Sequence, residues 1–319
     1  MSRVKTIIIL SLKEQNFCVI MCVVSHMIVR EKQVKNIFTK SDLPVGDFSV
    51  NPYVGCSHAC MYCYACYMKR FTRHEEPWGE FVDVKYWPTI RNASKYEGKH
   101  IVLGSVTDPY QPLEKKYERT RSFLEQMQDS GIGLTIITKS DLILRDMDLI
   151  KKYDKVELAW SINTVKDSFQ REMDRAVSID RRFAAMREFH SRGIPTVCFA
   201  APIFPGTDVK QIIDAALGCC DRIWLENLNL RGSYRYAIMD YIKAKHPRLY
   251  ALYKEIYDYG DKTYWRALDL ELREYCQSIG LQYVNSGEVV STDSKALTVI
   301  NFFYHEKIKR SAKEGTDLQ

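Results

Sequence analysis

Short β-rich runs alternate with longer segments of helical periodicity from about residue 48 onward, and this alternation constrains the fold of the 319-residue chain more than any other feature. Parallel strands joined by helical crossovers produce such a pattern. Each candidate strand is short and rich in Val, Ile, Leu or aromatic residues. The six candidates are residues 48–54, 100–106, 134–138, 156–162, 196–201 and 222–227. The sequence therefore predicts an α/β fold.

Helical segments are predicted between the strands and again after the last of them. Those between the strands carry apolar residues on one face, and two of them stop at Gly193 and Gly218. They span residues 113–127, 179–190 and 207–217. After residue 227 the alternation is lost. There the sequence predicts helices at 234–244, from Pro247 onward and at 264–279, then a strand at 297–303 and a basic C-terminal helix.

The length of the chain suits one barrel domain with an extension. We expect the barrel in residues 31–230 and a mostly helical extension, packed on the barrel, in residues 231–319. Residues 1–30 are a separate N-terminal extension in this interpretation. Aliphatic and aromatic residues are spread along the whole chain, as in a folded protein.

The N-terminal extension contains two apolar runs, at residues 6–12 and 17–24. Neither reaches the roughly 20 residues that a membrane-spanning helix needs. The segment also lacks the single long apolar core and the cleavage site of a secretory peptide. We therefore expect no membrane association, and we hypothesise that translation begins at Met27 or Met21.

Charge and cysteine content set the expected compartment and partners. The formal net charge is +6, from 46 basic and 40 acidic residues, and it permits an anionic partner without arguing for one. With no export signal, the ten cysteines predict a reducing cytoplasm and no disulfide framework. Four of them lie in or beside apolar segments, where a free thiol behaves as a small hydrophobic group. These four are Cys198, Cys219, Cys220 and Cys276.

Three other cysteines, Cys56, Cys60 and Cys63, lie within eight residues directly after a candidate strand. Soft thiolates select zinc, copper(I) or iron–sulfur clusters. A closed zinc site needs four ligands, usually from two short pairs, and the second pair is missing here. A four-iron cluster held by three thiolates leaves one iron open to a small molecule, which indicates chemistry. A zinc site or a group of buried thiols is the structural alternative.

The Cys-x3-Cys-x2-Cys spacing, with Tyr62 just before the third cysteine, resembles the radical S-adenosylmethionine (SAM) superfamily. Four further segments resemble the branch related to spore photoproduct lyase, so the resemblance covers about residues 48–230. These segments are residues 51–56, 107–114, 138–140 and 160–163. With residues 77–85 and 301–305 included, the chain looks most like the radical SAM mobile pair protein B group. That group is found paired with a second radical SAM protein, and its substrate is not settled.

The resemblance implies a partial (β/α)6 TIM-like barrel with its site at the C-terminal ends of the strands. It implies a [4Fe-4S] cluster on Cys56, Cys60 and Cys63, with SAM bound to the open iron. It also implies that an electron from a low-potential donor cleaves SAM to a 5'-deoxyadenosyl radical, which abstracts hydrogen from a substrate. In such enzymes the cofactors carry the hard chemistry, and the protein orients them and excludes water.

The resemblance also assigns cofactor-binding residues. Thr107, Lys139 and Ser161 match positions that contact SAM in photoproduct lyase, and Tyr62 would lie near the adenine. Hydroxyl groups can bind ribose or amino-acid groups, and the Lys139 ammonium can pair with the methionyl carboxylate. The hydrogen-donating cysteine of photoproduct lyase aligns with Ser105, whose O–H bond is too strong for that role. We therefore predict no photoproduct lyase activity.

Several other residues have both a functional and a structural interpretation. Asp108 and Tyr110 could face substrate or form an ordinary turn. Cys66 has no place in the superfamily pattern, and we expect it to be incidental. We expect packing or solvated histidines at His58, His74 and His305. A second metal site at Cys18 and Cys22 is not expected.

The basic residues Lys69, Arg70 and Arg73 could line an entrance for a phosphate-bearing substrate, as could those at 307–310. We expect a solvated surface there, because the sequence shows no flanking run of exposed aromatic residues for stacking bases. The favoured function is a radical SAM enzyme acting on an unidentified substrate, a nucleic acid or modified macromolecule by analogy alone. The competing functions are a cluster-stabilised binding or partner protein without turnover and a zinc-dependent nucleic-acid-binding module.

Overall fold

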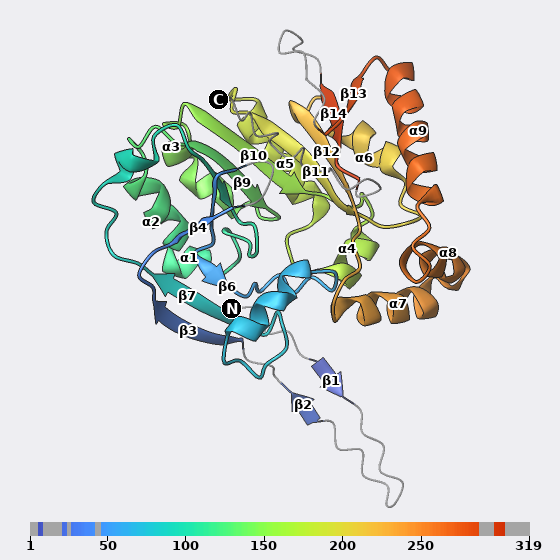
Figure 1. The fold of residues 1–319 in the computed structure, drawn as a ribbon, viewed down its shortest axis with the longest axis horizontal. Helices are drawn as coiled ribbons and strands as arrows, with labels where there is room; N and C mark the ends of the chain where they lie inside the picture. The colour runs from blue at the N-terminus through green and yellow to red at the C-terminus, as the bar shows by residue number, and fades with distance from the viewer. Residues whose placement is uncertain (1–5, 9–20, 24–26, 42–45, 287–296, 304–319) are drawn as a thin grey trace, which may run out of the picture.

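A computed structural model describes residues 6–8, 21–23, 27–41, 46–286 and 297–303. Its main sheet has the strand order β13-β14-β12-β11-β10-β9-β8-β5-β4 (Figure 1). These strands are β4 (Phe38–Lys40), β5 (Phe48–Val50), β8 (His100–Leu103), β9 (Gly133–Thr138), β10 (Lys155–Ser161), β11 (Thr196–Ile203), β12 (Arg222–Asn227), β13 (Gln282–Asn285) and β14 (Thr298–Asn301). Every ladder is parallel except that between β4 and β5. The predicted α/β fold, with six parallel barrel strands β5 and β8 to β12, is confirmed.

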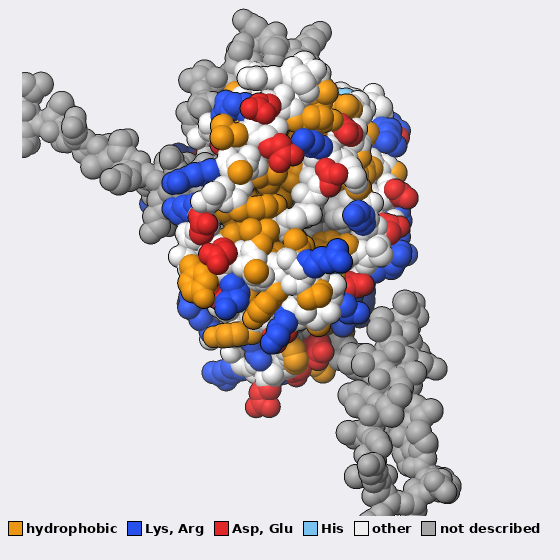
Figure 2. Space-filling view, turned by 90° about the vertical axis from the view of Figure 1, so that its right-hand side faces the viewer, with side chains coloured by type: hydrophobic (Ala, Val, Ile, Leu, Met, Phe, Trp, Pro, Cys, Tyr) orange, Lys and Arg blue, Asp and Glu red, His pale blue; other side chains and the backbone are white. Residues whose placement is uncertain are grey.

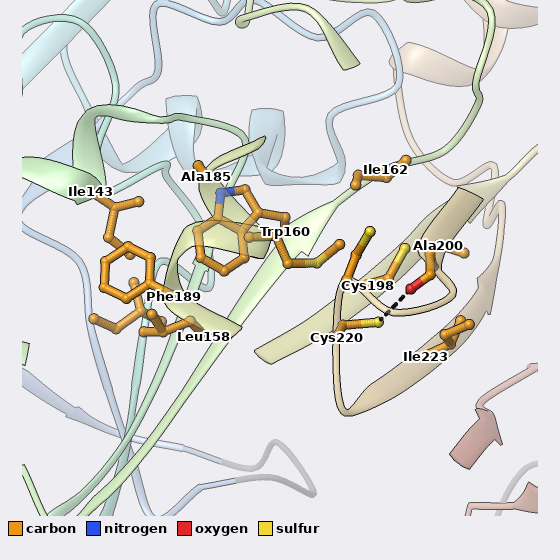
Figure 3. Close-up of a cluster of buried hydrophobic side chains, with 14 of the residues drawn as sticks. Ile143, Leu158, Trp160, Ile162, Ala185, Phe189, Cys198, Ala200, Cys220 and Ile223 are labelled. Atoms are coloured by element: carbon orange, nitrogen blue, oxygen red, sulfur yellow. Dashed lines mark hydrogen bonds between the residues drawn. The ribbon is translucent and has the colours of Figure 1, made fainter. Parts of the chain in front are cut away.

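Helices follow the barrel strands and pack against them. They are α1 (Glu114–Tyr117), α2 (Arg119–Gln126), α3 (Met147–Ile150), α4 (Asp167–Met173), α5 (Ile179–His190) and α6 (Val209–Ala216), with short 3-10 helices η2 (Ala93–Tyr96) and η3 (Leu142–Asp146). Apolar residues of α2, α3, α5 and α6 form one buried cluster with the strands. Figure 3 shows Trp160 of β10 in this core, with Phe189 of α5 on one side and Cys198 and Cys220 on the other.

The four cysteines expected in apolar segments are buried and free of disulfide bonds. Burial raises the pKa of the Cys198 thiol well above its usual value and that of Cys220 to about 12. The Cys198 and Cys220 thiols therefore stay protonated, and the four buried cysteines act as small hydrophobic groups, as predicted.

The strand predicted over residues 48–54 is wrong beyond Val50. Pro52 has no N–H to donate to a ladder, and the chain leaves the main sheet there. Residues Tyr53–Val54 form β6, which pairs with β7 (Phe81–Tyr86), and β7 pairs with β3 (Ile28–Gln33) in a separate three-stranded sheet. This departure places the segment that follows β6 beside the ends of the barrel strands.

The helix predicted over residues 113–127 is interrupted at Glu118, which has a left-handed φ of 48°. The carboxylate of Glu114 accepts hydrogen bonds from the backbone N–H groups of Thr120 (2.9 Å) and Arg121 (3.2 Å). It thereby satisfies the first N–H donors of α2, and the helix restarts at Arg119.

The predicted C-terminal helices are confirmed as α7 (Tyr234–Lys245), α8 (Pro247–Tyr257) and α9 (Thr263–Ser278). The predicted last strand is β14, which pairs in parallel with β12 and so continues the sheet past the sixth barrel strand. Basic and acidic side chains are interspersed around a band of hydrophobic ones on the face shown in Figure 2. The predicted basic C-terminal helix lies outside the described residues.

The N-terminal extension is described only in part. β1 (Thr6–Ile8) and β2 (Met21–Val23) pair antiparallel and project away from the sheets in Figure 1. Within the described residues, the structure contains no helix that is both long and apolar enough to cross a membrane. The division into residues 1–30, 31–230 and 231–319 and the internal start codon stay predictions.

Candidate metal centre and cofactor site

The cysteine loop, residues 55–63, joins β6 to the 3-10 helix η1 (Tyr64–Phe71). Gly55 has a φ of +91°, and a Cβ at this position would lie 2.3 Å from the carbonyl oxygen of Phe81, so the tight approach to β7 requires glycine. Two turns follow, closed by hydrogen bonds from Ala59 N to Cys56 O (3.2 Å) and from Cys63 N to Cys60 O (3.1 Å). The turns hold the three thiols on one short loop.

The environment of the loop keeps its thiols protonated in the absence of a metal. Burial raises the pKa of Cys56 well above its usual value, and Asp108 and the Cys60 thiol raise it further. The Cys60 residue as a whole is partly exposed, but its thiol is enclosed. This enclosure raises the pKa of the thiol to about 12, although the positive charge of Lys139 acts in the opposite direction. Metal binding requires thiolates, so a bound cation must supply the compensating charge.

Among the described residues, no three His, Cys, Asp or Glu side chains converge closely enough to bind a single metal ion. Thiolates that bind a [4Fe-4S] cluster each bind a different iron and stand farther apart than ligands of one ion.

Some of the buried polar atoms without hydrogen-bond partners lie in or beside the cysteine loop. They include Ser57 Oγ and His58 Nδ1 within the loop and the indole nitrogen of Trp78 beside it. Both amide atoms of Asn163, which is buried just beyond the end of β10, also lack partners. Each such atom costs about 1–3 kcal/mol, and native structures keep few of them. The residues present therefore fit a bound group with both sulfur and polar contacts.

The Asp108 carboxylate joins the ends of β8 and β9 to the cysteine loop. It accepts hydrogen bonds from Thr138 Oγ1 (2.7 Å), Lys139 N (2.7 Å) and Tyr110 N (2.8 Å), and it pairs with His58 Nε2 (3.1 Å). Burial opposes its ionisation, but His58 and the donors outweigh burial and lower its pKa. Asp108 is thus occupied by structural contacts, and His58 is a packed histidine as expected.

Three of the four predicted SAM-binding residues lie in one network. Lys139 Nζ is 5.6 Å from the centre of the Tyr62 ring, and the Tyr62 hydroxyl donates to Asp174 Oδ2 (3.0 Å). Asp174 Oδ1 forms a fully buried ion pair with Arg182 Nη2 (2.9 Å), and Arg182 Nη1 donates to the carbonyl oxygen of Ser161 (3.0 Å). The ion pair thus connects the cysteine loop to the end of β10.

Thr107, the fourth predicted SAM-binding residue, contacts the cysteine loop from the other side. Its hydroxyl donates to the carbonyl oxygen of Gly55 (2.7 Å), and it accepts from Gln111 Nε2 (3.2 Å). Gln111 Oε1 accepts from Ser57 N (2.9 Å). The hydroxyl hydrogen of Thr107 is therefore used to hold the backbone next to Cys56.

Four residues of the site were not found from the sequence: Asn163, Asp174, Arg182 and Trp78. Arg182 carried a signal, because it lies on the apolar face of α5 between Ile179 and Phe183, where a buried charge needs a partner. Asn163 and Trp78 lie within segments 160–163 and 77–85, which carry the family resemblance, but the sequence predicted no role for either residue, and Asp174 carried no signal.

The other candidate residues have contacts of their own. His74 is buried between Asp83 and Glu76, and Cys66 Sγ is 3.7 Å from Ser233 Oγ. The Ser105 hydroxyl accepts from Asn51 Nδ2 (3.0 Å). Residues Cys18, His305 and 307–310 lie outside the described residues.

Comparisons with known proteins agree with this geometry. The family model described as the radical SAM superfamily matches residues 50–217. An uncharacterized protein of Methanocaldococcus jannaschii is 33% identical over 223 residues, which are 69% of this chain and 84% of that protein. A radical SAM Nalpha-GlyT isomerase of Pseudomonas phage M6 is 24% identical over 177 residues, 52% of this chain and 36% of the isomerase.

A solved structure of a spore photoproduct lyase mutant with dinucleoside spore photoproduct shares the fold with a TM-score of 0.52 at 17% identity. The match covers 69% of this chain and 66% of the lyase chain. The finer resemblance to the mobile pair protein B group stays a prediction. The chain belongs to the radical SAM superfamily, whose enzymes use a [4Fe-4S] cluster and S-adenosylmethionine.

Proposed function

We propose that this protein is a radical SAM enzyme in which Cys56, Cys60 and Cys63 bind the [4Fe-4S] cluster. The observation that carries the proposal is the group of unpartnered polar atoms around a loop with three enclosed thiols. When bound there, the cluster and SAM supply the electron and the carbon radical for abstraction of a hydrogen atom from a substrate.

The described side chains suggest how SAM is held. Lys139 lies near the Tyr62 ring and suits a carboxylate, and the unpartnered amide of Asn163 can both donate to and accept from ribose or amino-acid groups. Ser161 is the last residue of β10, two residues before Asn163, and we propose that its hydroxyl also contacts SAM and that the Tyr62 ring contacts the adenine. Thr107 contributes chiefly by fixing Gly55.

Cluster assembly tests the ligand assignment. Single Cys→Ala variants at residues 56, 60 and 63 are reconstituted anaerobically, with Cys66→Ala as the matched control. We expect each ligand variant to lose most of its iron and sulfide and the control to keep both. Equal iron and sulfide in Cys63→Ala and in the control would reject the assignment.

The helix η1, which follows Cys63, points to a class of substrate. A solvated surface is expected around Lys69, Arg70 and Arg73 because the sequence shows no run of exposed aromatic residues beside them. The structure contradicts that reason. Tyr64, Tyr67 and Phe71 are 54%, 43% and 66% exposed on η1. The Arg70 guanidinium lies 4.6 Å from the centre of the Phe71 ring and 5.5 Å from that of Tyr67. Such stacking groups among cations suit single-stranded nucleic acid.

The placement of η1 supports a contact with substrate. The Tyr64 hydroxyl donates to the carbonyl oxygen of Ser105, just past β8, and Cys66 approaches Ser233 at the start of α7. The helix therefore crosses between two segments at the C-terminal end of the barrel. We propose that a nucleic acid binds there, and the spore photoproduct lyase structure likewise contains a dinucleoside.

Fluorescence anisotropy with a labelled single-stranded oligonucleotide tests this substrate class. Tyr67→Ala and Phe71→Ala should each weaken binding by about 1–3 kcal/mol, the usual worth of base stacking. Tyr259→Ala is the control, since Tyr259 is 68% exposed with Lys254 Nζ 5.8 Å from its ring. Equal losses in all three variants, or no binding by the wild type, would reject the nucleic-acid proposal without affecting the cluster proposal.

Partners stay proposals as well. A low-potential electron donor is required by the proposed chemistry, and a second radical SAM protein of a mobile pair is inferred from the sequence resemblance alone. Both are tested by adding candidate partner proteins to an assay that measures the 5'-deoxyadenosine formed by cleavage of SAM.

A further inference from the structure

The segment 72–80 leads from η1 to β7 and packs directly on the cysteine loop. Gly79 has a φ of +95°, and a Cβ there would lie 2.6 Å from Ala59 Cβ and 2.9 Å from Ala59 Cα. Ala59 itself has a left-handed φ of 48°. The two backbones therefore touch between Cys56 and Cys60 with no room for a side chain on Gly79.

Trp78, the neighbour of Gly79, brings an unpartnered donor to this contact. Its indole nitrogen is buried and has no partner that satisfies hydrogen-bond geometry within the described residues. It nevertheless lies within hydrogen-bonding reach of the Cys63 thiol. A neutral thiol is a weak acceptor, whereas a thiolate is a strong one. The donor therefore suits Cys63 in its metal-bound form.

Neighbouring side chains hold the indole in place. Its ring meets the buried Phe81 edge to face, with centroids 5.7 Å apart, and Phe81 stacks on His74 at 3.9 Å. His74 is fixed between Asp83 and Glu76, with both N···O distances at 2.9 Å. The Phe81 ring also lies beside the cysteine loop, because its Cδ2 would be 3.3 Å from a Cβ on Gly55.

We propose that Trp78 is a positioning residue whose indole N–H donates a hydrogen bond to the Cys63 thiolate of the cluster and raises the cluster's reduction potential. The inference rests on the proposed cluster ligands. A hydrogen bond to sulfur favours the reduced cluster, which carries one more negative charge, over the oxidised cluster.

The test is an anaerobic redox titration of the reconstituted full-length protein, followed by electron paramagnetic resonance of the reduced cluster. In Trp78→Phe we expect reduction to become about tenfold less favourable, which is about 59 mV for a one-electron couple. Trp87→Phe is the matched control, because the indole nitrogen of Trp87 is also buried without a partner but lies by Arg119 and the main core. Its potential should equal that of the wild type.

An unchanged potential in Trp78→Phe, or equal shifts in both variants, would overturn the inference while leaving the ligand assignment intact. Failure of the wild type to assemble any cluster would instead reject the ligand assignment, and the inference with it. Should Trp78→Phe not assemble a cluster, pulsed resonance of wild-type protein with isotope-labelled indole nitrogen decides the question. Coupling between that nitrogen and the reduced cluster is expected, and its absence would overturn the inference.

Discussion

Replacement of Asp174 by asparagine tests the ion pair that connects the cysteine loop to the barrel. The Asp174 and Arg182 side chains are both fully buried and 2.9 Å apart. Asp174 also accepts from the Tyr62 hydroxyl and from Gln170 Nε2 (2.7 Å). Asparagine keeps the size of the side chain and removes its charge, so Arg182 remains buried without a counter-ion.

Loss of one partner from a buried ion pair costs about 3–5 kcal/mol, and we expect Asp174→Asn to lose that much free energy of unfolding in urea titrations. Asp167→Asn is the control, because Asp167 and Arg171 form an exposed pair 3.7 Å apart. Exposed pairs contribute less than about 1 kcal/mol. Equal losses in the two variants would refute the view that the buried charge of Arg182 depends on Asp174.

The same carboxylate should contribute to the pH dependence of stability. Burial opposes its ionisation, but the charges of Arg182 and Lys139 and the hydrogen bonds from Gln170 and the Ala176 backbone together outweigh burial and lower the pKa of Asp174 below its ordinary value of 3.8. The stability that it contributes is therefore present above pH 3.8 and is lost as the pH falls through the lowered pKa. Asp174→Asn should show a shallower loss of stability in this acid range, and an unchanged acid limb would contradict the assignment.

Three further variants test the site. Lys139→Met should weaken SAM binding by about 1.5–3 kcal/mol in equilibrium dialysis while the cluster absorbance stays unchanged; unaltered affinity would remove Lys139 from the SAM site. Gly79→Ala should lower the free energy of unfolding in urea by about 1–3 kcal/mol more than Gly260→Ala. Both glycines have a positive φ, but only Gly79 faces Ala59, so equal losses would contradict the contact. Tyr62→Phe should cost about 1–3 kcal/mol of stability through its lost hydrogen bond and leave the iron content intact; a loss of iron would show that the hydroxyl acts on the cluster.

The parts of the fold that follow local periodicity could be predicted from the sequence. The barrel strands and the helices α5 to α9 show runs or repeats that specify them within a few residues of their ends. The break at Glu118 could not be predicted, because no glycine or proline marks it and the cap comes from the Glu114 side chain. The departure of the chain from the main sheet at Pro52 is marked in the sequence by the proline itself, which cannot donate to a strand ladder.

One part of the cofactor site could likewise be predicted from the sequence, and the other part could not. The three cysteines are close in the sequence, so their spacing alone indicates a metal centre. Trp78 and Asp174 reach the cysteine loop from segments whose approach depends on the folded sheet packing, and no local pattern reports such contacts. The exposed aromatic face of η1 was also missed, because eight residues of 3-10 helix carry too weak a periodicity to show which side faces solvent.

The most direct test of the central claim is the formation of 5'-deoxyadenosine by the anaerobically reconstituted full-length protein after addition of SAM and dithionite. Chromatography of the wild type, Cys60→Ala and Cys66→Ala measures the product. We predict product from the wild type and from Cys66→Ala and none above background from Cys60→Ala. A cluster-loaded wild type that forms no more product than Cys60→Ala, with or without a partner protein, would contradict a radical SAM enzyme and support a cluster-stabilised binding protein.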